Sequence, residues 1–391
     1  MKTSIRRWLY LGTFAGIILL NILAWSSTSF CDWYISNVFP LWVETYGRLT
    51  GLFPFSVGEL LLILGIFLVA AALGLALVLL LHRIISACRK KKDTKSKHGK
   101  FFRAAGYFYR ILAWILLVVC LLMTLNCTML YHGSAFNERY FGKEDREYTF
   151  KELLAVRNYV VEQCNALSGQ MARDANGDIV YEGDMKAEAI RCMQRLGENY
   201  EGLSGFYPGP KALLFSDFMC QQYMQGYYFP FSMEANYNDV MYLTNKPTTF
   251  CHELAHLKGY IYEDEANLIG FLACISSEDV FFRYSGYLSV LYYLDNDFYA
   301  AIGENRERYK EEVQILPQVH ADNIFVKQEE WDRINGKALV DTEVVEAVSD
   351  SFTETSLKLN GVEDGMLSYS RVVKLLLQYY EGTLYSFPSQ Q

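Results

Sequence analysis

Residues 251–256 read Cys251-His252-Glu253-Leu254-Ala255-His256. This H-E-x-x-H stretch is the most informative feature of the sequence for the fold of the chain. On a helix, residues four apart lie one turn apart on the same face, so the two imidazoles would point the same way with a carboxylate beside them. Two histidines also meet this spacing by chance on ordinary helices. Six histidines in 391 residues make such a match rare, and the pattern is typical of zinc hydrolases.

A third metal ligand is expected in the run Glu263-Asp264-Glu265-Ala266-Asn267, which begins seven positions after His256. Two histidines and one carboxylate are a common ligand set for Zn²⁺ in open catalytic sites. Glu263 and Glu265 both qualify, and Glu263 is favoured because Asn267 then lies one turn later, where it can hydrogen-bond a ligating imidazole. An acidic run also suits the first turn of an ordinary helix, whose dipole favours negative charge. The residues therefore leave both glutamates open as the third ligand.

Catalytic roles are expected at and after the motif. Glu253 stands beside one ligand and cannot join the same coordination, so we expect it to take a proton from a metal-activated water and pass it to a leaving amine. Tyr284 and Tyr287, in segment 282–287, are candidate donors to an oxyanion, although aromatic residues at this density also suit a buried core. Segment 227–231 resembles a strand and is a candidate for holding an extended peptide by edge pairing.

Three apolar segments dominate the first third of the chain, at residues 8–25, 57–81 and 107–130. Each is long enough to cross the hydrocarbon core of a bilayer, so lipid is an expected partner. Arg6 and Arg7 before the first segment also suit a signal peptide. Its apolar run is longer than a usual signal core, which favours an uncleaved anchor.

The distribution of basic residues predicts the sidedness of these crossings. The loop 83–103 carries nine Lys or Arg residues against one acid, Asp93. Cytoplasmic loops are enriched in Lys and Arg, so this loop is predicted to be cytoplasmic, and the N-terminus with Lys2, Arg6 and Arg7 lies on the same side. Three crossings then place the rest of the chain outside the cytoplasm, anchored to the cell membrane as a multi-pass protein.

The part of the chain after the third crossing is acidic. Residues 132–391 carry 22 Lys and Arg against 40 Asp and Glu, a net charge of −18. This charge argues against nucleic acid as a partner, and solubility and repulsion from an anionic envelope account for it. The expected substrate class, a protein or peptide, follows from the motif. Nine cysteines without a C-x-x-C pair predict buried free thiols. The oligomeric state does not follow from these features.

The chain is expected to divide into a three-helix membrane anchor, 1–131, and an extracytoplasmic domain, 132–391. Apolar spacing predicts helices, and segments bounded by turn residues predict strands. Besides the motif helix, which should end near Gly259, and a helix from Glu263, the predicted helices are 150–167, 184–196, 297–315, 340–357 and 369–380, and the predicted strands lie in 212–216 and 225–237. The fold class is therefore an α-helical transmembrane region followed by an α+β, mainly helical domain.

Six segments together resemble an uncharacterised bacterial family of three-crossing membrane proteins with a predicted metallopeptidase domain. They are Tyr228-Phe229-Pro230-Phe231, Glu234-Ala235-Asn236, residues 251–256, residues 263–267, residues 282–287 and Leu359-Asn360-Gly361-Val362-Glu363-Asp364-Gly365. The resemblance spans nearly the whole chain and implies a zincin-like fold of the gluzincin type. It also implies that Glu263, the first Glu of an E-x-x-x-[D/N] pattern, is the third ligand. The seven-position step from His256 is shorter than that of thermolysin-like enzymes, and the resemblance supplies no substrate.

The expected function is a membrane-anchored zinc metallopeptidase that cleaves peptide bonds outside the cytoplasm. The alternative is a metal-containing sensor or binding module that signals through the membrane helices. Intramembrane proteolysis is disfavoured because polar and charged residues crowd both flanks of the motif, from Asp239 and Lys246 to Lys258 and Glu263.

Overall fold

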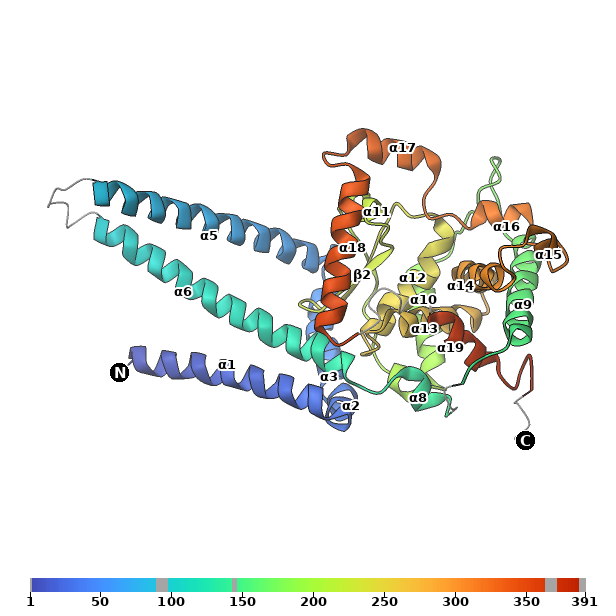
Figure 1. Ribbon diagram of the computed structural model, residues 1–391, viewed down its shortest axis with the longest axis horizontal. Helices are drawn as coiled ribbons and strands as arrows, with labels where there is room; N and C mark the ends of the chain where they lie inside the picture. The colour runs from blue at the N-terminus through green and yellow to red at the C-terminus, as the bar shows by residue number, and fades with distance from the viewer. Residues whose placement is uncertain (1, 89–97, 143–145, 363–370, 387–391) are drawn as a thin grey trace.

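Three long helices extend side by side from one end of a helical body (Figure 1). A computed structural model describes residues 2–88, 98–142, 146–362 and 371–386. The long helices are α1 (Lys2–Ser26), α5 (Val57–Cys88) and α6 (His98–Met123), and α6 continues through η2 (Thr124–Thr128) into α7 (Met129–Tyr131). Three stretches in them are long and apolar enough to cross a membrane, Ile5–Ser26, Val57–Ile85 and Gly99–Tyr131. They coincide with the three predicted apolar segments, as expected of a membrane protein.

The basic loop between the second and third spans is largely outside the described residues, which omit 89–97. The side of the membrane on which each end of the chain lies therefore stays a prediction. The N-terminus of α5 and the C-terminal end of the third span both lie against the body, whereas the C-terminus of α5 and the N-terminus of α6 lie at the far end of the spans (Figure 1).

The connection between the first two spans is folded and packs into the body. It forms α2 (Thr28–Asn37), α3 (Phe39–Trp42), η1 (Val43–Gly47) and α4 (Arg48–Gly51). Cys31, Ile35, Phe39 and Val43 are buried in the same hydrophobic cluster as the motif helix. The division of the chain at residue 131 remains a prediction, but this part of the expected anchor shares its core with the following domain.

The body is mostly helical, with a small sheet, as predicted. Its helices are α8 (Phe136–Tyr140), α9 (Phe150–Ser168), α10 (Met185–Gly197), η3 (Glu201–Leu203), α11 (Ser216–Gln221), η4 (Leu243–Asn245), α12 (Lys246–His256), α13 (Glu263–Ile275), α14 (Val280–Ala301), α15 (Arg306–Lys310), α16 (Pro317–Asp322), α17 (Gln328–Lys337), α18 (Thr342–Leu359) and α19 (Arg371–Tyr380). The helices predicted at 150–167, 184–196 and 340–357 are confirmed as α9, α10 and α18. The predicted helix 369–380 is α19, although its first two predicted residues lie outside the described part of the chain.

The helix predicted at 297–315 is wrong. The chain instead forms α14 from Val280, and α14 ends at Ala301. Asp279 caps its start, because the carboxylate accepts hydrogen bonds from the amides of Phe281 and Phe282. Gly303 and Glu304 have φ angles of +68° and +57°, which no α-helix can continue through. Apolar and aromatic residues occur on nearly every face of the α14 sequence, so no clear polar stripe reveals this helix.

The sheet has three short strands in the order β1-β3-β2. β1 (Lys211–Ala212) runs parallel to β3 (Glu234–Tyr237), which pairs with β2 (Gly226–Phe229) in antiparallel fashion. The strands predicted within 225–237 are confirmed as this hairpin. The strand predicted at 212–216 is wrong beyond Ala212, because the amides of Leu214 and Phe215 donate to the Glu59 carboxylate at 2.9 and 3.0 Å and no sheet partner takes them.

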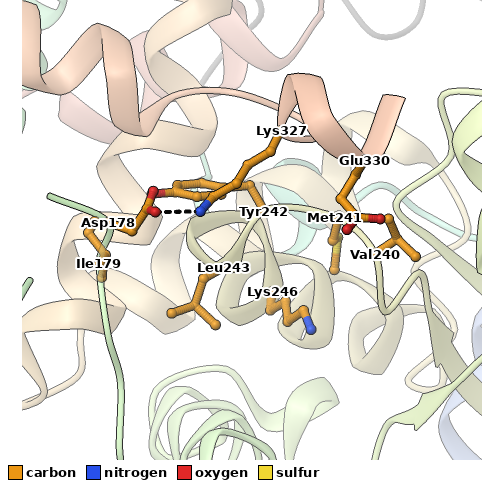
Figure 2. Close-up of a pocket in the computed structure, with 9 residues that line it drawn as sticks. All are labelled: Asp178, Ile179, Val240, Met241, Tyr242, Leu243, Lys246, Lys327 and Glu330. Carbon is orange, nitrogen blue, oxygen red and sulfur yellow. Dashed lines mark hydrogen bonds and ion pairs between the residues drawn. The ribbon is translucent and has the colours of Figure 1, made fainter. Parts of the chain in front are cut away.

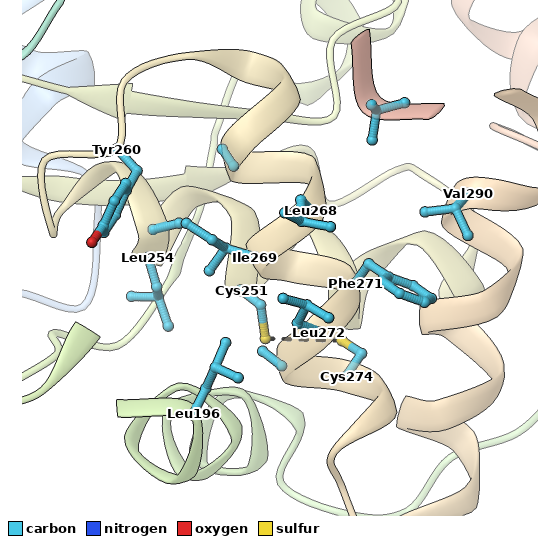
Figure 3. Packing of buried hydrophobic residues seen from close by; sticks show 14 of the residues in the cluster. Leu196, Cys251, Leu254, Tyr260, Leu268, Ile269, Phe271, Leu272, Cys274 and Val290 are labelled. Carbon is cyan, nitrogen blue, oxygen red and sulfur yellow. Dashed lines mark hydrogen bonds between the residues drawn. The ribbon is translucent and has the colours of Figure 1, made fainter. Parts of the chain in front are cut away.

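The motif helix α12 is packed on several sides by other helices (Figure 3). Leu196 of α10, Leu254 of α12, Phe271 of α13 and Val290 of α14 are all at most 5% exposed. Burying each such side chain contributes about 1.5–3 kcal/mol, so the position of α12 is well fixed. The sulfurs of Cys251 and Cys274 lie 3.9 Å apart within this core, and the described cysteines are free thiols, as predicted.

Candidate metal centre

A sharp reversal of the chain places α13 against α12. α12 ends at His256, close to the predicted end, and Gly259 follows with a φ angle of +93°, a conformation that favours glycine. α13 then begins at Glu263, as predicted. A side chain at Gly270 would come within 3.0 Å of the Thr248 carbonyl oxygen, so glycine permits the two helices to approach closely. This packing brings the first turn of α13 opposite the two motif histidines.

His252, His256 and Glu263 form a cluster whose potential ligand atoms all lie within 4.8 Å of one another. The Nε2 atoms of the two imidazoles are 3.1 Å apart. The Glu263 carboxylate lies 3.1 Å from Nε2 of His252 and 3.9 Å from Nε2 of His256. The structure thus brings together the three residues predicted as metal ligands, in an arrangement that could hold a metal ion.

Hydrogen bonds behind the imidazoles determine which ring nitrogen faces the cluster. Nδ1 of His252 lies 2.9 Å from Oδ1 of Asn267, and Nδ1 of His256 lies 2.7 Å from the carbonyl oxygen of Tyr260. Both partners accept, so each Nδ1 carries the hydrogen and each Nε2 presents a lone pair. Two lone pairs and a carboxylate therefore converge on one point, and only a positive charge can satisfy all three.

The pKa values of the three side chains are shifted in a way that fits a site lacking a cation. Burial lowers the pKa of His252, but the hydrogen bond and charge of Glu263 outweigh burial and raise it to about 9. Burial and the neighbouring charge of His252 lower the pKa of His256 to about 4. Burial opposes ionisation of Glu263, yet its hydrogen bond with His252 lowers the pKa below the usual value. Without a metal ion, the cluster holds one proton, on His252. The pKa values of the two histidines shift in opposite directions because the charge of His252 disfavours a second proton on His256.

Glu253 is buried beside the cluster without a strong partner. Its side chain is 4% exposed, and its Oε2 atom has no hydrogen-bond partner. Burial, opposed by His252 and reinforced by Glu263, raises the pKa of Glu253 to about 8. A side chain at Gly226 of β2 would overlap the Glu253 carboxylate, so the outer strand of the sheet passes directly over this group. Without a metal ion, this carboxyl group therefore holds its proton near neutral pH.

Of the two other candidate residues on α13, Glu265 points away from the histidines and Asn267 contacts one of them. The Glu265 carboxylate turns away from the histidines and accepts a hydrogen bond of 2.7 Å from the amide of Phe136 at the start of α8. Residues two apart on a helix point in different directions, which is why the two glutamates diverge. Asn267 makes the predicted hydrogen bond with a motif imidazole, that of His252.

Tyr284 and Tyr287 lie on α14 and are buried, and their hydroxyl groups have partners away from the cluster. The Tyr284 hydroxyl donates to Asp322 at 2.7 Å, and the Tyr287 hydroxyl lies 3.4 Å from that of Tyr159. Their predicted catalytic role has no contact with the site to support it. Tyr293, farther along α14, was not singled out from the sequence, although burial and the charge of Glu263 raise its pKa. No sequence pattern could have revealed that Tyr293 lies near Glu263, because this proximity depends on how α14 crosses α13.

A separate hollow of about 230 Å³ lies at the other end of α12 (Figure 2). Its cationic groups are already paired with acids: Lys327 contacts Asp178 at 2.5 Å, and Lys246 contacts Asp239 at 2.8 Å. Leu243 and Tyr242 form part of its wall. Charged groups that neutralise each other leave this hollow without the unsatisfied acceptors that mark the metal centre.

A family model matches residues 34–377, which include the connection after the first span, the other two spans, the sheet and the metal centre. The family is described as a protein of unknown function, DUF3810. No curated protein and no solved structure matches the chain. Because the match covers most of the 391 residues, the chain belongs to the DUF3810 family.

Proposed function

We propose that this protein is a membrane-anchored, zinc-dependent metallopeptidase that hydrolyses peptide bonds outside the cytoplasm. The observation that carries the proposal is the convergence of two imidazole lone pairs and one carboxylate at the centre formed by His252, His256 and Glu263. No donor among the described residues satisfies all three.

The donor set fits Zn²⁺ well. Two neutral imidazoles and one carboxylate are a known catalytic set, whereas Mg²⁺ and Ca²⁺ prefer oxygen ligands alone. Asn267 and the Tyr260 carbonyl hold the imidazoles in the required tautomer from behind, as ligating histidines usually require. A zinc ion bound by three side chains keeps a fourth position for water and lowers the pKa of that water toward neutrality.

Glu253 would then act as the general base and acid. Its carboxylate takes the proton from the attacking water and later gives it to the nitrogen of the leaving amine. The pKa of about 8 applies without a metal ion, and a nearby dication favours the ionised form that can accept this proton.

The sheet offers a surface for the substrate backbone. β2 is the outer strand of the described sheet, and Gly226 brings it close to Glu253. Tyr227 is 39% exposed on this strand. An extended peptide that pairs with such an edge would lie across the metal centre. A motif helix, an edge strand and a following acidic helix together support the zincin-like, gluzincin-type assignment.

Contacts with the spans support a site close to the membrane, on the outer side. The Asn126 side chain, near the end of the third span, donates to the Pro230 carbonyl at 2.8 Å, and the Tyr262 hydroxyl donates to the Tyr131 carbonyl at 2.8 Å. The basic sequence 83–103, which joins the second span to the third, supports a cytoplasmic position for the ends of α5 and α6 that lie away from the body. Reporter fusions after residue 98 should be cytoplasmic and fusions after residue 145 external, and a cytoplasmic result for the second would refute the outer location.

A metal-containing sensor is the second candidate, and the contact between Asn126 and Pro230 favours it because a shift of the third span would reach the β2–β3 turn. The Tyr228 hydroxyl reinforces this link by donating to the Asn126 carbonyl at 3.3 Å. A sensor needs the metal but does not need Glu253. Activity that depends on Glu253 would therefore distinguish the peptidase from the sensor.

Metal analysis of the purified full-length protein tests the proposal. The natural chain should hold about one zinc ion, as three-ligand catalytic sites do. Glu263→Ala should lose most of this zinc, whereas the matched variant Glu265→Ala should keep it. Loss in Glu265→Ala alone would transfer the ligand role to Glu265, and a natural chain that binds no zinc would overturn the proposal.

A further inference from the structure

Helix α18 exposes an apolar stripe that the body does not cover. Val344, Val348, Phe352 and Leu359 are 53%, 65%, 76% and 75% exposed. At 100° per residue these four side chains fall within about 80° of one another around the helix, so they lie along one stripe, which also includes the polar residue Thr355 between Phe352 and Leu359. An exposed stripe of this kind marks an interaction surface.

The other sides of α18 have different roles. Partly buried and mostly polar residues, including Thr342, Ser349 and Thr353, face the body, and Leu357 is buried. The opposite sector carries charged residues such as Glu343 and Asp350, which are exposed. The apolar stripe lies between the sector that contacts the body and the sector suited to water. The apolar sector of α18 is therefore suited to contact an apolar surface that is not part of the described body.

The C-terminal end of α18 lies at the ends of the first and third spans. Gly361 ends the helix with a φ angle of +86°, and the Val362 amide donates to the Leu357 carbonyl at 3.0 Å. A side chain at Gly361 would come within 3.0 Å of Trp25, in the last turn of α1. Thr128, at the end of η2, donates to the Asn360 side chain at 3.4 Å.

The N-terminal half of α18 is connected to the start of the second span. The Gln221 side chain of α11 donates to the Val340 carbonyl at 3.1 Å and to Thr342 at 3.2 Å. The amides of Leu214 and Phe215, just before α11, are held by the carboxylate of Glu59 in the first turn of α5. One end of α18 is thus fixed near the second span and the other near the first and third.

These contacts orient α18 across the ends of the spans, roughly perpendicular to them (Figure 1). A helix in this position lies parallel to the membrane plane at its surface. Other exposed apolar side chains occupy the elements that join α18 to the spans: Leu52 and Phe53 precede α5, and Leu214, Phe215 and Phe218 belong to α11 and the residues before it. These side chains add exposed apolar surface beside the start of the second span.

We propose that the apolar stripe of α18 (Val344, Val348, Phe352 and Leu359) is a membrane-binding surface that inserts into the lipid interface beside the spans. The occupant is the bilayer, because the connected spans place the stripe at the level where headgroups meet acyl chains. The charged sector, with Glu343 and Asp350, then faces water. Contact along α18 fixes the height and tilt of the body above the membrane, which three spans gathered at one end would not fix alone.

Photo-crosslinking in liposomes tests this proposal with the full-length protein. A benzophenone amino acid replaces Phe352 or Val348, and the protein is reconstituted in vesicles of phosphatidylcholine and phosphatidylglycerol. Asp350 is the matched position in the charged sector, and Leu64, 53% exposed and about two turns into α5, is the position expected in lipid. Mass spectrometry measures the yield of phospholipid adducts at each position.

Positions 352 and 348 should give lipid adducts at a yield close to that of position 64 and on the order of tenfold above position 350, because only the stripe is immersed. Two stripe positions are used so that misfolding at one does not decide the result. Yields at 352 and 348 no higher than at 350 would overturn the proposal. Crosslinked dimers in place of lipid adducts would also overturn it and would assign the stripe to a second copy of the chain.

Discussion

Two carboxylates in the body, Glu234 and Glu263, lie in opposite electrostatic situations: the Glu234 side chain is 1% exposed and the Glu263 side chain is 30% exposed. The Glu234 carboxylate accepts hydrogen bonds from the side chains of Lys211 and Ser232, both at 2.5 Å, and from the amides of Gly58 at 2.7 Å and Val57 at 3.1 Å. Glu263 instead faces two imidazoles whose Nδ1 hydrogens are already donated elsewhere. Glu234 is saturated by donors from its own chain, whereas Glu263 is not.

The difference teaches how to separate a structural buried acid from a binding site. An ionised carboxylate is costly to bury unless donors or a cation compensate it. At Glu234 the four donors compensate the buried charge. Their hydrogen bonds connect the first turn of α5 to the sheet. At the candidate metal centre no donor among the described residues satisfies Glu263 and both imidazoles together, and acceptors that converge in this way are typical of a cation site.

Substitution of Glu253 provides the largest expected effect. Glu253→Gln should keep its zinc, because Glu253 is not among the three converging ligands, yet it should lose on the order of a thousandfold or more in peptide hydrolysis because proton transfer fails. Glu265→Gln is the matched control at an equally buried acid and should stay active. Zinc content and cleavage by the purified protein measure both. Retained turnover in Glu253→Gln would remove this residue from the mechanism.

Loss of a donor to Glu234 should lower the stability of the protein but should not change its zinc binding. Lys211→Met leaves Glu234 buried without its cation and should lower the free energy of unfolding by about 3 kcal/mol. The three remaining donors keep the loss from being larger. Lys310→Met, which removes an exposed ion pair with Glu307, should cost less than about 1 kcal/mol. Denaturant unfolding in detergent measures the loss, and zinc per folded chain should not change. A loss of zinc in folded Lys211→Met would mean that the two centres are coupled.

The smallest expected effect concerns the support behind the metal centre. Asn267→Ala removes the acceptor that holds Nδ1 of His252 and should weaken zinc affinity by about 10- to 100-fold. Asn267→Asp keeps an oxygen acceptor there and should retain the affinity. Competition with a zinc chelator measures both variants. Equal affinity in Asn267→Ala and the natural chain would show that the tautomer of His252 is set by other contacts.

Local patterns predicted much of this protein because their chemistry depends on near neighbours in the chain. The three apolar segments, the motif helix and the start of α13 were all predicted from spacing and composition, and each agrees with the structure. Predictions were wrong where longer contacts decide the backbone. Leu214 and Phe215 leave the sheet for the carboxylate of Glu59, and α14 begins at an Asp279 cap within a segment that is apolar on most sides.

By itself, the sequence determined which residues could serve as metal ligands, since a helix places His252 and His256 one turn apart wherever the helix lies. Only the tertiary structure placed Glu263, and not Glu265, beside the two imidazoles, because that position depends on how α13 folds back on α12. It likewise gave Tyr284 and Tyr287 partners away from the cluster and drew the connection between the first two spans into the core. The physical reason is that spacing fixes direction along one helix, whereas the partner that a side chain meets is fixed by packing between elements distant in the chain.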